Sequence, residues 1–307
     1  MARTTTRGGD QRKSSEQRQA ERQALLDSLG EKVATLADSA EWIAYLQFMT
    51  AFRRYSFNNL MLIALQCPHP NRVAGFRKWQ QLGRQVRKGE KAIKILGYST
   101  KKVTKTDLAT AEDVEDRIAR YPVLSVFDVS QTDGDPVPNL DYDLPTGDGP
   151  AGILDRLIRW LEGDGWSVRE LPLDGTMEGY TDHRRHIIAT ENNLEPAARL
   201  MVLLHESTHA LLHEDDAEYV AHRGVCETEA ESTAYVLAGV LGMDADASSV
   251  SYIAGWARAD RDVVTVAATN VLRAVNTIAA ALGLNDDDTE EDAGTNAART
   301  GKDVHAA

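Results

Sequence analysis

Residues 198–213, Ala-Arg-Leu-Met-Val-Leu-Leu-His-Glu-Ser-Thr-His-Ala-Leu-Leu-His, decide how the second half of this chain folds. The segment Leu200–Leu204 is uniformly apolar and leads directly into His-Glu-Ser-Thr-His, so we expect one mostly buried helix over residues 194–214. On an α-helix, residues four apart stand one turn above each other on the same face. His205 and His209 can therefore direct two imidazole nitrogens at one metal ion.

Between these histidines, Glu206 is placed for catalysis rather than for metal binding. It lies about 100° round the helix from His205, close enough to meet a water on the ion without being a ligand. Zinc lowers the pKa of its bound water to about 7, and a nearby Glu can take the proton as the water attacks a carbonyl. The spacing therefore predicts Zn²⁺ as cofactor and Glu206 as the catalytic base. The alternative is two surface histidines on an amphipathic helix, but unpartnered histidines on a buried helix are costly, and a metal is a natural partner.

The third ligand has to come from another segment. His213 lies about 12 Å from His205 along a straight helix, too far to share one tetrahedral ion with both other histidines. The next predicted helix, which begins at Glu227, offers three carboxylates. Glu227 and Glu231 share a face, and Glu229 points roughly the other way. We prefer Glu227 as the ligand and Glu231 as the residue that orients a ligand histidine, or as an alternative ligand. A solvated acidic face is the competing interpretation.

The two helices together resemble a known family. HESTHALLH followed by ETEAESTAYVLAGVLG is similar to the ImmA/IrrE type of zincin metallopeptidase, over roughly residues 150–260. The resemblance implies the same two histidine ligands and the same base, a third ligand at Glu227, and a peptide or protein substrate. Glu231 departs from the pattern, because many members have Asn there, so the choice between Glu227 and Glu231 stays open.

An oxyanion-stabilising group is harder to identify from the sequence. Zincins need a cation or a phenol opposite the attacking water. Three residues near the predicted site qualify by type, although each also fits a structural or surface role: His222, Arg223 and Tyr252.

The charge of the chain is divided unevenly. Residues 1–105 carry 20 Lys and Arg against eight Asp and Glu, a net charge of +12, so the total of −13 leaves −25 for the rest. A split of this size implies two halves with different partners.

Residues 71–105 hold eleven Lys and Arg and one acid, Glu90. Three aromatic residues are interleaved with them: Phe76, Trp79 and Tyr98. Cations can neutralise phosphates while aromatic faces stack on unpaired bases; a solvated basic surface is the alternative.

Several motifs of the basic half are similar to the N-terminal domain of the ArdC antirestriction proteins. They are Tyr55-Ser-Phe-Asn-Asn-Leu, Gly75-Phe-Arg-Lys-Trp, Gly83-Arg-Gln-Val-Arg-Lys-Gly-Glu-Lys and VFDVSQT, in this order over about 40–132. The usual Gly-x-Asn appears here as Phe-Asn-Asn. The resemblance implies binding of single-stranded DNA and a zincin domain that follows. The implied DNA-binding residues are Asn58, Asn59, Trp79, Arg84, Arg87, Lys88, Lys91 and Lys94, although Trp79 also fits a core position. No base-reading motif is present, so little sequence preference is expected.

These features predict an α+β protein of two domains, and the length allows each its own core. A helix-plus-antiparallel-sheet DNA-binding domain covers 19–132, and a zincin-like metallopeptidase domain covers 151–284. Residues 133–150 are rich in Asp, Gly and Pro, as linkers are. The polar ends, 1–18 and 285–307, are expected to be disordered. The predicted strands are 92–100, 121–132, 166–173 and 183–190.

The remaining sequence indicates a cytoplasmic protein with no membrane partner. No run approaches the roughly 18 to 20 apolar residues of a membrane helix, and the N-terminus lacks the apolar stretch of a secretion signal. The two cysteines, Cys67 and Cys226, fit a reducing compartment.

The leading hypothesis is a single-stranded-DNA-binding zinc metallopeptidase that acts as an antirestriction factor or as a factor of a mobile element or phage. Alternatives are a non-catalytic DNA protector with a structural zinc, and a regulatory protease that cuts a repressor. Glu206 favours an enzyme, because a structural site has no use for a general base.

Overall fold

A computed structural model describes residues 14–36, 38–67, 70–106, 113–136, 150–173, 177–214, 216–243 and 261–284. The helices are α1 (Ser15–Thr35), α2 (Ser39–Phe52), α3 (Phe57–Gln66), α4 (Phe76–Gln81), the 3-10 helix η1 (Val129–Gln131), α5 (Pro150–Gly163), α6 (Pro196–Leu212), α7 (Asp216–Val240) and α8 (Arg261–Ala281). The strands are β1 (Val73–Gly75), β2 (Arg84–Val86), β3 (Ile93–Leu96), β4 (Ser99–Thr106), β5 (Asp113–Arg120), β6 (Val123–Asp128), β7 (Thr132–Gly134), β8 (Ser167–Leu171), β9 (Gly179–Asp182) and β10 (Ile187–Glu191). Helices combined with small, mostly antiparallel sheets confirm the predicted α+β class.

The described strands form small sheets in separate parts of the chain. In the basic half, β6 pairs antiparallel with both β1 and β3, β2 pairs with β7, and β4 pairs with β5. In the second half the order is β8-β10-β9, with β10 parallel to β8 and antiparallel to β9. Strand β9, which lies between the predicted strands 166–173 and 183–190, is at the edge of this sheet.

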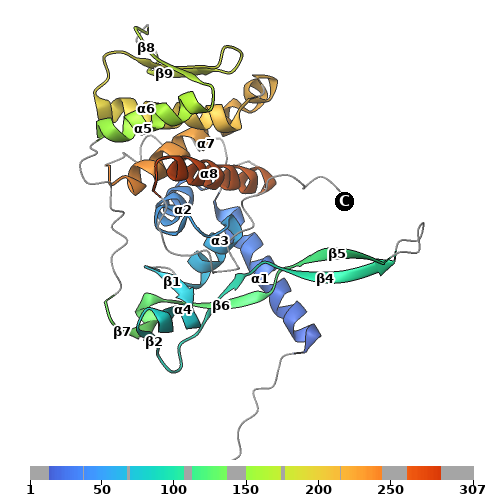
Figure 1. Ribbon diagram of the computed structural model, residues 1–307. Coiled ribbons are helices and arrows are strands. Elements are labelled where there is room, and N and C mark those ends of the chain that lie inside the picture. The colour runs from blue at the N-terminus through green and yellow to red at the C-terminus, as the bar shows by residue number, and fades with distance from the viewer. Residues whose placement is uncertain are drawn as a thin grey trace, which may run out of the picture.

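The two halves share one hydrophobic core. The buried face of helix α2 includes Trp42, Leu46 and Met49, which are fully buried. Its other face is exposed at Ala44, Gln47 and Ala51, so α2 covers the core from one side. It packs against α7, and the Tyr45 hydroxyl donates a hydrogen bond to the carbonyl of Ala268 in α8. Figure 1 shows α2 and α3 below α7 and α8, with α5, α6 and the β8-β10-β9 sheet above them. The basic half thus contributes helices to the core around α7, and a second, smaller cluster of Ala74, Trp79 and Val86 lies within the basic half.

Helix α8 explains an apolar segment of the second half. Asp262–Ala281 is long and apolar enough, by length and composition, to cross a membrane, and half of that window is buried inside the protein. Its buried residues, Val264, Ala267, Ala268, Val271, Val275 and Ile278 among them, pack against α1, α5, α6 and α7. Packing within the core therefore accounts for its composition.

Several predicted boundaries differ from the structure. Helix α1 begins at Ser15 with a capping box between Ser14 and Gln17, so the predicted disorder up to residue 18 extends too far. The predicted strand 92–100 is divided into β3 and the start of β4, and β4 and β5 form a long hairpin that projects from the body (Figure 1). Residues 1–13, 137–149 and 285–307 lie outside the described residues, so the expected disordered ends and most of the linker stay predictions, as do the domain boundaries.

Candidate metal centre

Helix α6 presents the His-Glu-Ser-Thr-His segment from a buried position. The helix starts with Pro196 in its first turn, where the missing N–H costs nothing. Leu200, Leu203 and Leu204 are fully buried and fix one face of the helix in the core. The helix packs against α5 and α7 and against strands β9 and β10. This packing sets the direction of the polar side chains that follow Leu204.

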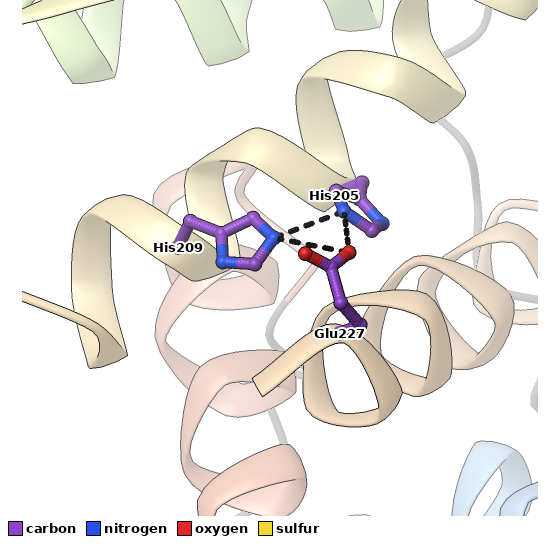
Figure 2. Close-up of side chains that lie close together, drawn as sticks. All are labelled: His205, His209 and Glu227. Carbon is purple, nitrogen blue, oxygen red and sulfur yellow. Dashed lines mark hydrogen bonds and ion pairs between the residues drawn. The ribbon is translucent and has the colours of Figure 1, made fainter. Parts of the chain in front are cut away.

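His205, His209 and Glu227 converge as Figure 2 shows, with the carboxylate reaching from α7 to the two imidazoles of α6. The two Nε2 atoms lie 3.0 Å apart. Oε2 of Glu227 lies 3.5 Å from Nε2 of His205 and 3.8 Å from Nε2 of His209. Ligand atoms of a tetrahedral zinc, at bond lengths of about 2.0–2.2 Å, lie roughly 3.3–3.6 Å apart. The donor types and spacing therefore fit a divalent metal.

The protonation of these groups suits metal binding. Burial, together with the charges of His205 and His213, lowers the pKa of His209 to about 3. The hydrogen bond from His205 lowers the pKa of Glu227 to about 2. Burial opposes protonation of His205, but Glu227 and the charge of Glu206 outweigh it and raise its pKa. At neutral pH the cluster thus offers an unprotonated His209 and an ionised Glu227, and His205 is the ligand at which a proton competes with a metal first as the pH falls.

The Glu206 side chain of α6 is held in place by a residue of the edge strand β9. The Thr181 hydroxyl in β9 lies 2.7 Å from Oε2 of Glu206 and 3.0 Å from its carbonyl oxygen. Burial is the main cause that raises the pKa of Glu206, and the Thr181 hydrogen bond opposes the shift. Gly179 lies so close that a Cβ there would be 3.1 Å from Oε1 of Glu206. Sequence reasoning missed Thr181, because only the sheet brings β9 to α6.

A tyrosine that the sequence analysis did not single out contacts the carboxylate ligand. The Tyr219 hydroxyl donates a short hydrogen bond to Oε1 of Glu227, and its ring lies edge-on to His209 with centroids 5.6 Å apart. Burial and this hydrogen bond raise the pKa of Tyr219 to about 12, so the phenol keeps its proton. Helix α7 is broken between these residues by the non-helical backbone of His222. Residues 216–221 were expected to be a polar loop, which is why Tyr219 had no assigned role.

Glu229 and Glu231, the other two carboxylates of the predicted helix that begins at Glu227, lie in different surroundings. Oε2 of Glu231 is buried and has no hydrogen-bond partner among the residues that the structure describes, and burial raises the pKa of Glu231. Glu229 is buried on the opposite side, bonded to His213 and Asn270. His213 contacts His209 rather than the cluster of ligand atoms, in agreement with its predicted exclusion as a ligand. Glu231 makes no hydrogen bond to His205 or to His209 in the structure, so no contact supports the orienting role predicted for it.

These groups line one cleft of about 820 Å³. Its lining includes His205, Glu206, His209, Glu227 and Glu231, the β9 residues Gly179, Tyr180 and Thr181, and Tyr219 and Arg223. Among the residues considered for oxyanion stabilisation, Arg223 lines the cleft with a largely exposed side chain. His222 is exposed at the break in α7, and Tyr252 lies outside the described residues.

Two of the predicted DNA-binding residues are structural. Trp79 is fully buried, and its indole Nε1 donates to the carbonyl of Phe127 over 2.8 Å. It therefore has no ring face exposed for a base, which corrects the assignment. Asn59 is also buried; its amide donates to the Leu96 carbonyl and accepts from the Leu96 N–H, both at 2.8 Å, so it joins α3 to β3.

The other predicted residues stay nearer the surface. Arg84 is tied to Thr132 and to the carbonyls of Gly134 and Asp135, which holds β2 to β7. Lys94 donates to Ser125. Asn58, Arg87, Lys88 and Lys91 are exposed.

A second cleft, of about 640 Å³, lies beside these cations. It is lined by Phe76, Gln85, Val86, Arg87, Lys88, Glu90, Phe127 and Asp133. Phe76 is 42% exposed and packs edge-on against Phe127. Phe76, rather than Trp79, is thus the aromatic side chain of its short helix that is open to solvent. By composition, either ring could stack on a base; the burial of Trp79 and the exposure of Phe76 distinguish them.

Comparison with known proteins bears on both halves. Residues 25–129 match the family described as the N-terminal domain of anti-restriction factor ArdC. An uncharacterized protein of Bacillus anthracis, pXO2-81, is 30% identical over 292 residues, with 82% of this chain and 49% of that protein covered. The chain thus spans about half the length of that relative. Two crystal structures of the antirestriction protein ArdC from the R388 plasmid, one metal-free and one Mn(II)-bound, are each 22% identical with a TM-score of 0.47. They cover 75% and 76% of this chain, and this chain covers 85% and 91% of theirs.

Proposed function

We propose that this chain, whose residues 25–129 form an ArdC-type N-terminal domain, is a single-stranded-DNA-binding zinc metallopeptidase of the antirestriction type. The observation that carries the proposal is the cleft in which His205, His209 and Glu227 converge while Glu206 stands beside them without joining them. A purely structural metal site does not need that fourth group. The low cysteine content, two residues in the chain, fits a cytoplasmic location.

Zinc suits this donor set, because two imidazoles and one carboxylate are the ligand types of catalytic zinc sites. Bound there, it would supply a Lewis acid that polarises a carbonyl and acidifies water. Glu206 would take a proton from the attacking water and return it to the leaving amine. Its burial strengthens it as a base, and the Thr181 hydroxyl holds its carboxylate toward the cleft.

The substrate class that we propose is an extended peptide or a protein segment. Strand β9 forms the edge of its sheet among the described strands, and Gly179, Tyr180 and Thr181 of that strand line the cleft. An extended peptide can add to such an edge through main-chain hydrogen bonds. Such pairing would place a scissile carbonyl beside Glu206.

The basic half would hold single-stranded DNA. The exposed cations Arg87 and Lys88 border the cleft that contains the exposed ring of Phe76. Cations that neutralise phosphates beside an aromatic face that stacks on a base are the usual components of single-strand binding. Glu90 and Asp133 partly offset this charge, since both pair with Arg87.

Peptide hydrolysis can be tested with the zinc-loaded full chain and a peptide library read by mass spectrometry. Glu206→Gln is the matched variant, because it keeps the side-chain shape and removes the base without touching the three ligands. We expect cleavage by the unchanged chain and its loss in Glu206→Gln at equal zinc content. Equal product from both proteins, or none from either, would reject the peptidase.

A second candidate, a non-catalytic DNA protector with a structural zinc, is favoured by one observation. Glu231 lines the same cleft, and its buried Oε2 has no hydrogen-bond partner within the described part of the chain. A fourth protein ligand would close the site against water. X-ray absorption at the zinc edge distinguishes the two candidates when the unchanged chain is compared with Glu231→Gln. A coordination shell that changes in Glu231→Gln would support the closed site, and an identical shell would support the open one.

A further inference from the structure

A chain of hydrogen bonds leads from the candidate ligand His209 into the core. Nδ1 of His209 lies 2.8 Å from Nδ1 of His213, the residue that ends α6. Nε2 of His213 lies 2.8 Å from Oε2 of Glu229 in α7. The Asn270 amide in α8 donates to Oε1 of Glu229 over 2.9 Å. The side chains of His213 and Glu229 are 5% and 3% exposed, so the chain of bonds is shielded from water.

We propose that His213, Glu229 and Asn270 are positioning residues that orient the imidazole of His209 and strengthen its binding of a metal. The proposal rests on the metal site proposed above and adds residues that neither the spacing of the motif nor the ligand cluster includes. Glu231 was expected to orient a ligand histidine, and Glu229, on the other side of α7, makes the contact through a second histidine instead.

The direction of each bond follows from the chemistry of imidazole. The Nε2 atom of His209 faces His205 and Glu227, so a metal bound there leaves the ring proton on Nδ1. That Nδ1–H donates to Nδ1 of His213, which must then be the unprotonated nitrogen of a neutral ring. The proton of His213 is therefore on Nε2 and donates to Glu229. An ionised Glu229 accepts this bond on one oxygen and the Asn270 bond on the other.

This arrangement does more than fill the core. A buried carboxylate is costly unless it is hydrogen-bonded, and an apolar residue would serve packing alone. The carboxylate instead polarises His213, and through it the ring of His209, which raises the basicity of the ligand nitrogen. The bonds also fix the ring orientation, so that Nε2 stays directed at the metal. Removal of such outer partners typically lowers metal affinity roughly 10–100-fold.

The test measures zinc affinity of the full chain by competition with a chromophoric chelator, alongside thermal unfolding of the metal-free proteins. Glu229→Gln keeps the shape of the side chain and removes its charge. Thr233→Val is the matched control, because Thr233 is buried in the same helix and its hydroxyl donates to the backbone carbonyl of Glu229, not to the Glu229 carboxylate. We expect Glu229→Gln to bind zinc roughly 10–100-fold more weakly, and Thr233→Val to bind as the unchanged chain does. Unchanged affinity in Glu229→Gln, or an equal loss in Thr233→Val, would overturn the proposal.

Two further measurements keep the result unambiguous. If Glu229→Gln does not fold, the ¹⁵N shifts of the histidine rings in the zinc-loaded unchanged chain decide instead. Protons on Nδ1 of His209 and Nε2 of His213 support the proposal, and a proton on Nδ1 of His213 overturns it. His205→Ala tests the metal site itself. Loss of zinc in His205→Ala with full affinity in Glu229→Gln would reject the positioning role alone, whereas zinc retained in His205→Ala would reject the site.

Discussion

The indole Nε1 of Trp42 donates a hydrogen bond to Oγ of Ser232, 3.0 Å away, and both side chains are fully buried. Trp42 belongs to α2 of the basic half, and Ser232 directly follows Glu231 in α7. A helix of the basic half therefore contacts the helix that carries the candidate carboxylate ligand. Both halves therefore contribute side chains to the core around α7.

Trp42→Phe should destabilise the whole chain in one step. The change leaves the Ser232 hydroxyl buried without its donor, which costs about 1–3 kcal/mol. Urea unfolding followed by tryptophan fluorescence and by circular dichroism should give one coincident transition, shifted to lower urea. Trp160→Phe, in α5 and away from the contact between α2 and α7, is the control for the loss of a fluorophore. Two separate transitions in the unchanged chain would contradict the common core.

Gly179→Ala should impair catalysis more than metal binding. A methyl group there would meet Cγ1 of Val202 at 2.6 Å and Oε1 of Glu206 at 3.1 Å, so β9 or the Glu206 carboxylate has to move. We expect peptide cleavage to fall while zinc content is unchanged. Gly163→Ala, where a Cβ would meet nothing within 4 Å, is the control. Full activity in Gly179→Ala would show that the position of Glu206 does not matter.

Zinc affinity should depend on pH through a single group. The pKa of His209 is lowered to about 3 and that of Glu227 to about 2, so neither binds a proton near neutral pH. The pKa of His205 is raised, so His205 is the first of the three ligands to bind a proton as the pH falls, and zinc then has to displace that proton. Zinc binding should release about one proton, and affinity should fall roughly tenfold per pH unit below the pKa of His205. Calorimetry in buffers of different ionisation enthalpy measures this number. Release of no proton would contradict the protonation of His205.

The combined change Lys88→Ala and Lys91→Ala should weaken binding of single-stranded DNA in a salt-dependent way. Each phosphate contact that is lost reduces the slope of log affinity against log salt by about 0.7 for single strands. We expect the slope of the double variant to fall by about 1.4. Arg159→Ala removes one exposed positive charge from α5 in the acidic half and should leave the slope unchanged. An unchanged slope in the double variant would place the DNA elsewhere.

The part of the site that sequence could predict is the part set by one helix. The placement of His205, Glu206 and His209 could be predicted from helical spacing alone. Glu227 could be proposed from its place at the start of the next predicted helix and from the family resemblance. Thr181 could not be predicted, because β9 meets α6 only through the sheet. The contact between His213 and Glu229 could not be predicted either, because it depends on how α6 packs against α7.

In the basic half, the sequence could not predict which aromatic side chains are exposed. Composition identified a cationic and aromatic region, but the exposure of a ring depends on packing. Trp79 is buried under β6 while Phe76, three residues earlier, is open to solvent. Asn59 was carried over from a family motif, and its paired bonds to Leu96 give it a structural role. The helices were predicted better than the strands, because α5, α6 and α8 have strong periodicity whereas β9 is short.

The central claim is that His205, His209 and Glu227 hold one zinc ion. Its most direct test is the zinc content, by elemental mass spectrometry, of the purified full chain and of His205→Ala after dialysis against trace zinc. The account predicts about one zinc per unchanged chain and none in His205→Ala, with His222→Ala as an exposed-histidine control that keeps its zinc. Undiminished zinc in His205→Ala would contradict it.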